Sequence, residues 1–316
     1  MNSYRNHLPQ LDANWFLTDG GLETTLIFDD GFELPDFAAF ALLDTTAGQA
    51  ALNRYFDSYV AIAKRDQVGI VLETPTWRAS ADWGARQGYS VEQLKQLNRH
   101  AVEFLQEVRR RHQTDSTPVV ISGCIGPRGD GYSAQERMTA EEARQYHALQ
   151  ASAFAEAGAD LVTAITITYA AEAVGVANAA KDAGVPAVIS FTVETDGTLP
   201  SGETLREAIE AVDSATGAYP AYFMINCAHP THFASVLDAG TDWTKRIRGL
   251  RANASSLSHA ELDESETLDT GHPAELAEQY RELRAAHPHL TVVGGCCGTN
   301  HQHVDAISRA CLGSAT

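Results

Sequence analysis

Three cysteines carry the clearest chemical signal in this sequence of 316 residues. Cys227 directly follows an apolar run, and Cys296 and Cys297 are adjacent, with two glycines before them and one after. Three thiolates form a soft ligand set that is typical of Zn²⁺. A catalytic zinc site keeps one coordination position open, and three protein ligands leave that position. The three cysteines therefore predict a zinc site that can also bind a substrate atom.

Cys124 and Cys311 have a simpler interpretation, because a lone buried cysteine usually packs as a small apolar side chain. A Cys–Cys pair between glycines is harder to explain by packing, since the glycines allow the backbone turn that brings two adjacent side chains to one ion. A strained disulfide between Cys296 and Cys297 is the alternative. The odd number of cysteines, five, indicates thiols or metal ligands rather than a disulfide framework.

A zinc–thiolate site with an open position is suited to activating a substrate thiol. Bound to the metal, such a thiol loses its proton well below its ordinary pKa of about 8.5 and is a nucleophile at neutral pH. This chemistry favours alkylation of the thiol, because hydrolytic zinc sites usually have histidine and carboxylate ligands. His229, His301 and His303 lie near the same strand ends, and we interpret them as solvated or supporting residues. A zinc hydrolase that needs no thiol stays as an alternative.

The chain alternates between short apolar runs and longer amphipathic stretches. Near-continuous apolar runs are typical of parallel strands that are covered on both faces. Eight such runs are present, over Trp15–Asp19, Val68–Glu73, Val119–Gly123, Leu161–Thr166, Ala187–Thr192, Tyr222–Cys227, Ile247–Asn253 and Leu290–Gly294. A 3.6-residue apolar rhythm predicts helices between them, and Thr139 is placed to cap one of these. The predicted helices include Val91–Arg111, Glu141–Ala157 and Ala274–Ala286.

Eight strand–helix units without a linker predict an α/β fold, a single (β/α)8 TIM barrel domain over residues 1–316. Such a barrel places its site, here the zinc site, at the carboxyl ends of the strands. A doubly wound sheet is the alternative, but the turn Asp19–Glu23 lacks the third glycine of a nucleotide-binding loop. The acidic segment Ser255–Pro273 is expected to form a loop with a short helix over the barrel mouth, or else an inert surface excursion.

The composition and net charge of the chain limit the kinds of partner that it is expected to bind. Apolar residues make up 44 % of the chain and the formal net charge is −18, so the sequence is typical of a globular, acidic protein. The acidic balance argues against a nucleic-acid partner, which needs a basic face. We find no apolar segment of signal-peptide length at the start and no stretch of about 18 apolar residues, so we expect a cytoplasmic protein without a membrane partner. No heptad pattern or appended arm defines an oligomeric state.

Four segments resemble motifs of the homocysteine S-methyltransferase family, which includes the betaine–homocysteine and S-methylmethionine–homocysteine enzymes. They are Thr18–Leu26, Ile125–Pro127, Ile225–Pro230 and Gly294–Thr299, and they extend from near the start of the chain to near its end. The resemblance implies a (β/α)8 barrel that binds zinc and transfers a methyl group to the zinc-activated thiol of homocysteine, forming methionine. It also implies two small-molecule partners, a thiol acceptor and an onium donor such as S-methylmethionine, betaine or dimethylsulfoniopropionate.

The resemblance assigns roles by matched position. It places Asp19 and the backbone of Gly20 and Gly21 at the amino acid moiety of homocysteine. Asn226 and Asn253 stand where the family often has asparagine. The zinc ligands that it implies are the three cysteines already singled out, Cys227, Cys296 and Cys297.

One position departs from the family pattern. At the end of the fourth strand the family often has Glu followed by Thr, and that Glu receives the substrate ammonium; here Ile165 takes its place. We expect Glu73, at the end of the second strand, to supply the carboxylate from another direction. The simpler alternative is that Glu73 is exposed to solvent or paired with an arginine, for which Arg78 is one candidate.

The last expectations concern the contact of Trp77 with the methyl donor and the identity of the acceptor. Trp77 follows the second strand and is expected to offer an aromatic face to the cationic methyl donor, with packing in its loop as the alternative. Because Ile165 cannot form an ion pair, two further readings stay open. One is a methyltransferase for a different thiol or a selenol, and the other is a non-catalytic homologue that binds zinc and a thiol.

Overall fold

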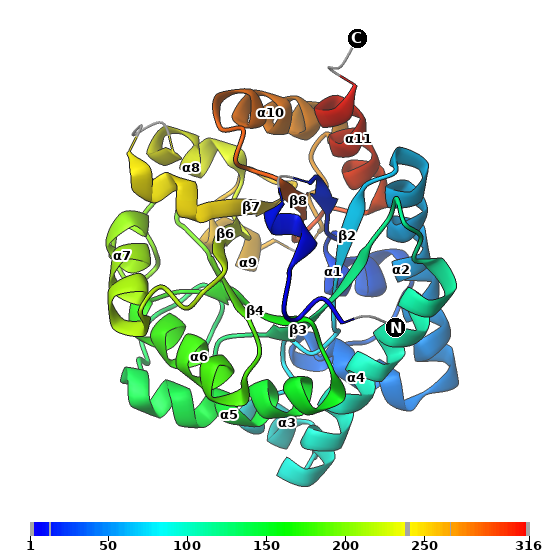
Figure 1. Cartoon of the computed structure of the whole chain (residues 1–316), viewed down its shortest axis with the longest axis vertical. Coiled ribbons are helices and arrows are strands. Elements are labelled where there is room, and N and C mark those ends of the chain that lie inside the picture. Colours follow the sequence, from blue (N-terminus) through cyan, green and yellow to red (C-terminus); the bar gives the residue numbers. More distant parts are fainter. Residues whose placement is uncertain (1–2, 13, 238–240, 266, 314–316) are drawn as a thin grey trace.

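The computed structural model describes residues 3–12, 14–237, 241–265 and 267–313, which form a closed barrel of eight parallel strands. The strands pair in sequence order, and β8 pairs with β1 to close the barrel (Figure 1). The predicted barrel and its eight strands are confirmed, although β1 is shorter than the predicted Trp15–Asp19. The strands are β1 Phe16–Leu17, β2 Gly69–Glu73, β3 Val119–Ile125, β4 Leu161–Ile167, β5 Ala187–Phe191, β6 Tyr222–Asn226, β7 Ile247–Ala252 and β8 Val292–Gly295.

Helices surround the barrel (Figure 1). The longer ones are α2 Thr46–Asp66, α4 Val91–His112, α5 Ala140–Ala157, α6 Ala170–Ala183, α7 Leu205–Thr216, α8 Pro230–Leu237, α10 Pro273–Ala286 and α11 His301–Leu312, and the short ones are α1 Leu22–Thr24, α3 Ala81–Arg86 and α9 His259–Asp263. The three predicted helices are confirmed as α4, α5 and α10. Thr139 caps α5 as expected: its hydroxyl accepts from the N–H of Glu142, whose carboxylate accepts from the N–H of Thr139. No helix among the described residues is long and apolar enough to cross a membrane.

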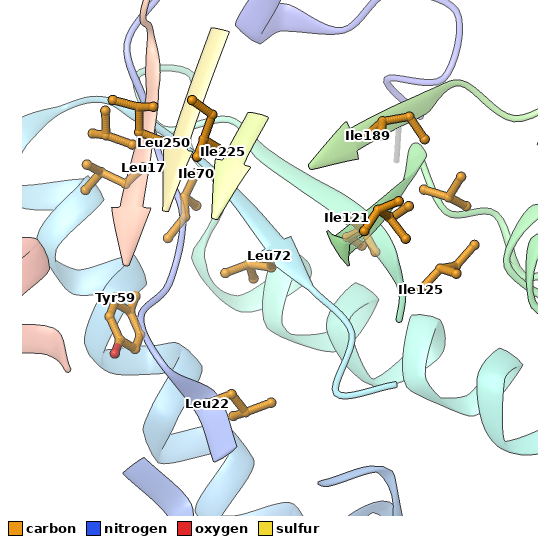
Figure 2. Close-up of a cluster of buried hydrophobic side chains, with 14 of the residues drawn as sticks. Leu17, Leu22, Tyr59, Ile70, Leu72, Ile121, Ile125, Ile189, Ile225 and Leu250 are labelled. Carbon is orange, nitrogen blue, oxygen red and sulfur yellow. The ribbon is translucent and has the colours of Figure 1, made fainter. Parts of the chain in front are cut away.

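Alternate residues of each strand face opposite sides of the barrel wall. Outward residues such as Ile70 and Leu72 pack in the large core between strands and helices (Figure 2). Inward residues near the amino ends, such as Val71, form a second and smaller core. Glu73 lies two residues further along the same inward row. The interior of the barrel therefore changes from apolar to polar toward the carboxyl ends of the strands. Residues at corresponding positions of other strands are Ser122, Thr163, Asn226 and Arg251, all buried.

The segment between β7 and α10 lies against the cysteine end of the barrel. As predicted, its described residues form a loop with a short helix, α9. His259, the first residue of that helix, is buried, and its Nε2 lies 2.8 Å from the carbonyl oxygen of Cys227. The segment therefore helps to cover the strand end that carries a predicted metal ligand.

Asp160 anchors the opposite end of the barrel. Its carboxylate forms a buried ion pair with Arg109 and accepts hydrogen bonds from the backbone N–H groups of Tyr4 and Ile121, at 2.8 and 2.9 Å. It also accepts from the hydroxyl of Ser3. One carboxylate thus joins the N-terminal segment, α4 and β3 at the start of β4.

Replacing Asp160 should be strongly destabilising. Asp160→Asn leaves the buried guanidinium of Arg109 without its charge partner, and we expect a loss of about 3–5 kcal/mol in the free energy of unfolding. Chemical denaturation measures this loss. As a control, Glu210→Gln breaks the exposed Arg206–Glu210 pair on α7 and should be nearly neutral. Equal effects of the two substitutions would show that the anchor is unimportant.

Candidate functional site

The three cysteines meet at the carboxyl ends of β6 and β8, as predicted. Their sulfur atoms all lie within 4.8 Å of one another, and the Sγ atoms of Cys227 and Cys297 are 3.9 Å apart. Sulfur ligands at about 2.3 Å from a tetrahedral Zn²⁺ are separated by about 3.8 Å. The residues present therefore fit a three-thiolate metal site.

Cys227 and Cys296 are joined as a disulfide, with their Cα atoms 5.5 Å apart. This corrects the expectation that all five cysteines are thiols or metal ligands. The cause is the convergence of the two strand ends, which brings the two sulfur atoms into bonding contact. Cys297 is free, so the vicinal bond considered from the sequence is not formed, and Cys124 and Cys311 are free and buried. A metal can use all three sulfur atoms only after this disulfide is reduced.

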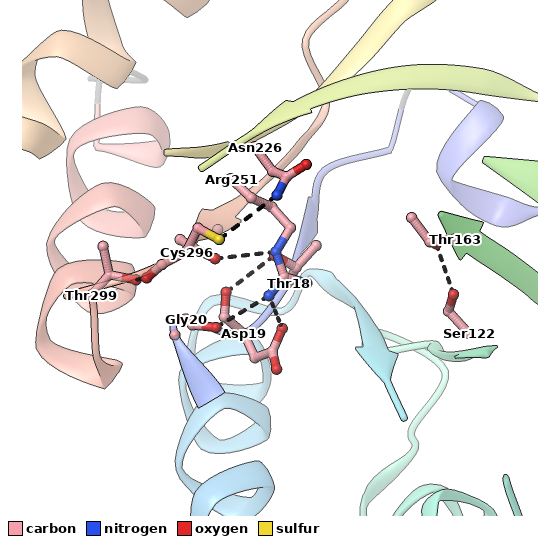
Figure 3. Close-up of polar contacts among 12 residues, drawn as sticks. Thr18, Asp19, Gly20, Ser122, Thr163, Asn226, Arg251, Cys296 and Thr299 are labelled. Carbon is pink, nitrogen blue, oxygen red and sulfur yellow. Dashed lines mark hydrogen bonds and ion pairs between the residues drawn. The ribbon is translucent and has the colours of Figure 1, made fainter. Parts of the chain in front are cut away.

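Each of the three sulfur atoms contacts a hydrogen-bonding side chain. The hydroxyl of Thr166 lies 3.8 Å from Cys227, and the amide Nδ2 of Asn226 lies 3.8 Å from Cys296 (Figure 3). The hydroxyl of Tyr132 lies 3.6 Å from Cys297. Hydrogen bonds of this kind orient metal ligands and favour their charged forms. Asn226 is held in turn, since its Oδ1 accepts from the N–H of Thr166 and the hydroxyl of Ser190.

The backbone at the sulfur atoms is unusual at two positions. Cys227 has a φ of 52°, a left-handed conformation that is uncommon outside glycine and that often marks functional sites. Gly298, directly after Cys297, has a φ of 76°, and a Cβ added there would lie 2.6 Å from the carbonyl oxygen of Asp269. Glycine is therefore required where the chain turns away from the cysteine pair.

The sulfur atoms line a cavity at the barrel mouth. Its accessible space is about 190 Å³, more than ten times the roughly 10–15 Å³ that one water molecule needs. The wall includes most of the predicted site residues, namely Asp19, Gly20, Gly21, Glu73, Trp77, Cys227, Cys296 and Cys297. Ile165 also lines it, so the neutral side chain at the departing position does face the candidate site.

Arg251 dominates the charge pattern on this wall. Its Nη2 forms an ion pair with Oδ1 of Asp19 at 2.6 Å and donates to the carbonyl oxygen of Gly20 at 3.1 Å, and its Nε donates to the carbonyl oxygen of Gly295 (Figure 3). The other oxygen of Asp19 accepts from the hydroxyl of Tyr55 at 3.1 Å. Burial alone would lower the pKa of Arg251, but the carboxylates of Asp19 and Glu73 raise it above its ordinary value. Asp19 is thus already paired within the chain.

Two further carboxyl groups line the cavity without a full charge partner. Burial raises the pKa of Glu73 to about 7 against the opposing effect of Arg251. Burial likewise raises the pKa of Glu23 to about 7. Glu73 is only 5 % exposed, and its charged neighbour is Arg251. Exposure to solvent is therefore wrong, and the neighbouring arginine is Arg251 rather than Arg78, since no ion pair joins Glu73 to Arg78 in the described part of the chain.

Trp77 lies in the cavity wall, but one face of its ring is covered. The guanidinium of Arg78 lies 3.9 Å from the centroid of a ring of Trp77 and 3.7 Å from that of Trp83. The indole N–H of Trp77 donates to the carbonyl oxygen of Ile165 at 3.1 Å. Trp77 therefore joins the loop after β2 to β4, and Arg78 takes the cation position on the covered face.

The remaining predicted residues lie beside the cavity rather than in its wall. Asn226 is fully buried beneath Cys296, and Asn253 is buried, with its backbone N–H donating to the carbonyl oxygen of Ala228. The N–H of Gly21 donates to the carbonyl oxygen of Thr299, so this amide is already used. His229 lies 2.8 Å from the hydroxyl of Thr231 in α8, and His303 lies 2.8 Å from the carbonyl oxygen of Thr270, as expected for supporting residues.

Sequence reasoning missed Arg251, Tyr132 and Glu23. Arg251 had a usable signal, because it is a charged residue near the carboxyl end of a predicted strand, two positions before Asn253. Glu23 belongs to the Asp-Gly-Gly segment but was not assigned a role. Tyr132 lies in the irregular segment between β3 and α5, where no periodicity shows which way a side chain points.

Comparison with known proteins matches this chain to one enzyme family and to two similar methyltransferases. Residues 16–311 match the family model described as homocysteine S-methyltransferase. The chain is 25 % identical over 260 residues to homocysteine S-methyltransferase 1 of Arabidopsis thaliana, covering 76 % of this chain and 78 % of the relative. It is 22 % identical over 261 residues to selenocysteine Se-methyltransferase of Brassica oleracea var. italica, covering 76 % and 74 %.

Solved structures share the fold. The oxidized form of the homocysteine methyltransferase MmuM from Escherichia coli superposes with a TM-score of 0.76 at 21 % identity, covering 97 % of this chain and 99 % of that one. The metallated form of the same protein gives a TM-score of 0.75 at 19 % identity, covering 95 % and 98 %. The chain therefore has the same fold as these solved structures.

The raised pKa of Glu73 predicts a pH-dependent stability. The folded carboxyl titrates near 7 and the unfolded one near 4.5, so between these values the folded state binds more protons and its free energy of unfolding falls as pH rises. Glu73→Gln removes this titration. The stability of the variant relative to the wild type should increase by about 1–3 kcal/mol between about pH 5 and about pH 7.5.

Denaturant unfolding of the metal-free protein at the two pH values measures this change. Glu210→Gln serves as the exposed control and should show the same difference from the wild type at both. A difference for Glu73→Gln that does not vary with pH would contradict the raised pKa.

Proposed function

The chain belongs to the homocysteine S-methyltransferase family and is a methyltransferase, and from this membership we propose that it is zinc-dependent and moves a methyl group from an onium donor to the thiol of homocysteine, forming methionine. The observation that carries the proposal is the convergence of three cysteine sulfur atoms on one wall of the cavity. The same cavity holds buried charged groups of both signs, which a zwitterionic acceptor and a cationic donor require.

Cys227, Cys296 and Cys297 would hold the zinc once the disulfide is reduced. When bound, zinc lowers the pKa of a thiol that coordinates it and so supplies a nucleophilic sulfur at neutral pH. Thr166, Asn226 and Tyr132 keep the three ligand sulfur atoms in place through the hydrogen bonds described above. The cavity wall positions the two substrates, because it holds the acceptor thiol and the methyl donor in line and excludes water.

The transfer itself is one displacement. A bond forms between the acceptor sulfur and the methyl carbon while the bond from that carbon to the donor sulfur or nitrogen breaks. The donor leaves as a neutral sulfide or amine, and the acceptor proton passes to solvent. The protein contributes positioning and thiol activation, so no side chain with a tuned pKa has to act as a general base.

The donor carries a positive charge that the wall must accommodate. Glu23 lines the cavity beside the glycine turn and is a carboxylate when deprotonated. Trp77 offers only the face that Arg78 leaves uncovered. We therefore place the cationic centre of the donor near Glu23, and the uncovered part of Trp77 contributes an aromatic wall.

A selenol acceptor is a second candidate. The observation that favours it is the similarity to a protein named selenocysteine Se-methyltransferase. Selenocysteine places its amino acid end one methylene closer to the reacting atom than homocysteine does. Comparison of kcat/KM for homocysteine and selenocysteine with the same donor shows which acceptor is preferred.

Zinc content measured together with methionine formation tests the proposal. The reduced, zinc-loaded protein should contain about one zinc per chain and should form methionine from homocysteine and one member of a panel of onium donors, detected by mass spectrometry. Serine substitution of Cys227, Cys296 or Cys297 should abolish both. Cys311→Ser is the matched control, because Cys311 is a buried cysteine of α11 outside the cavity, and it should keep both.

Three outcomes would contradict the proposal. They are a reduced protein that binds no zinc, methionine formation that survives loss of a cysteine ligand, and zinc-dependent turnover that needs no thiol. The last of these would favour the hydrolase alternative.

A further inference from the structure

Two positions that the family pattern associates with the amino acid end of homocysteine offer no free carboxylate in this chain. Both oxygens of Asp19 have partners, since Oδ1 pairs with Arg251 and Oδ2 accepts from Tyr55. The position from which a carboxylate was expected on β4 is occupied by Ile165, which is apolar. An amino acid bound at this site must be recognised by other groups.

Two unpartnered atoms of opposite charge belong to residues that line the same cavity. Nη1 of Arg251 and Oε2 of Glu73 are both buried and have no hydrogen-bond partner in the described structure. Each residue is 5 % exposed, and each lines the cavity that contains the cysteines. A buried polar atom without a partner is costly, so a pair of them in one cavity indicates a ligand with matching groups.

The guanidinium is fixed in place rather than mobile. Its Nε donates to the carbonyl oxygen of Gly295, the residue directly before Cys296, and its Nη2 is bound to Asp19 and Gly20. These contacts leave Nη1 as the remaining nitrogen. Because Gly295 and Cys296 are adjacent, the same backbone sets the distance between this nitrogen and the sulfur site.

We propose that Arg251 and Glu73 form the subsite for the amino acid end of the acceptor. Nη1 of Arg251 donates to the α-carboxylate, and Oε2 of Glu73 accepts from the α-ammonium. This subsite rests on the proposed function for the placement of the acceptor sulfur at the cysteines. It assigns Asp19 a different role, which is to hold Arg251 in place.

In this arrangement each charged group of a zwitterionic ligand faces a side chain of opposite charge. Within the three residues of the subsite, Arg251 pairs with Asp19, which leaves the negative charge of deprotonated Glu73. A zwitterionic amino acid adds one charge of each sign, so its ammonium offsets Glu73 and its carboxylate faces the guanidinium. The preferred ligand class is therefore an α-amino acid with a thiol or selenol, rather than a simple thiol.

Binding of three thiols to the zinc-loaded, reduced protein tests the subsite without any methyl donor. Homocysteine has both charged groups, 4-mercaptobutanoate lacks the ammonium, and 3-aminopropane-1-thiol lacks the carboxylate. Isothermal titration calorimetry should show homocysteine binding at least about tenfold more tightly than either analogue, as expected for loss of a charged hydrogen bond.

Two variants should each respond to one group of the ligand. Glu73→Gln should weaken homocysteine and 3-aminopropane-1-thiol by about tenfold and leave 4-mercaptobutanoate nearly unchanged. The double variant Asp19→Asn with Arg251→Met removes the ion pair without leaving a lone buried charge. It should weaken homocysteine and 4-mercaptobutanoate and leave 3-aminopropane-1-thiol nearly unchanged. Arg248→Met, on the same strand but outside the cavity wall, is the control and should leave all three affinities unchanged.

In this crossed pattern, each variant weakens only the thiols that carry one of the two charged groups. Such a pattern distinguishes direct contact with the ligand from a purely structural role of these residues. A Glu73→Gln variant that weakens all three thiols equally, or a wild type that binds all three equally, would overturn the proposal. If the double variant does not fold, the wild-type series and Glu73→Gln still decide it. A crossed pattern without methyl transfer would refute the proposed function and keep the subsite, whereas methyl transfer without the crossed pattern would do the reverse.

Discussion

Inside the barrel, inward-facing side chains change from apolar near the amino ends of the strands to polar near the carboxyl ends. Val71 and Glu73 illustrate this on β2, where two residues separate a core contact from a cavity wall. Closure of the barrel then brings every such row to one mouth. The cysteines at the ends of β6 and β8 meet there because both strands end at this mouth. The candidate site is a consequence of this packing constraint.

The charges at the mouth form one connected arrangement. Arg251 joins the end of β7 to Asp19 after β1 and to the backbone before Cys296, so three strand ends share one guanidinium. Removing charges from water is costly, and the pair Arg251–Asp19 offsets that cost only because each partner has additional hydrogen bonds. Burial raises the pKa of Glu73, and one of its carboxyl oxygens has no hydrogen-bond partner in the described structure, which makes it available to a ligand.

The sequence was sufficient for features that repeat locally. The apolar rhythm predicted α4, α5 and α10, the apolar runs predicted all eight strands, and the glycines around Cys296 and Cys297 indicated a shared site. Contacts between distant segments were not predictable in the same way. Arg251 donates to Gly20 across 231 positions, and no local pattern encodes that bond. The disulfide between Cys227 and Cys296 and the contact of Tyr132 with Cys297 likewise depend on how strand ends and loops meet in space.

X-ray absorption at the zinc edge tests the central claim most directly, namely that the three cysteines form a metal site with a position for the acceptor. The reduced, zinc-loaded protein would be measured alone and with selenohomocysteine, whose selenium is distinguishable from the cysteine sulfur atoms. Our account predicts three sulfur neighbours at about 2.3 Å in both samples and one selenium neighbour that is present only with the ligand. A zinc environment without three sulfur atoms, or one that selenohomocysteine does not change, would contradict it.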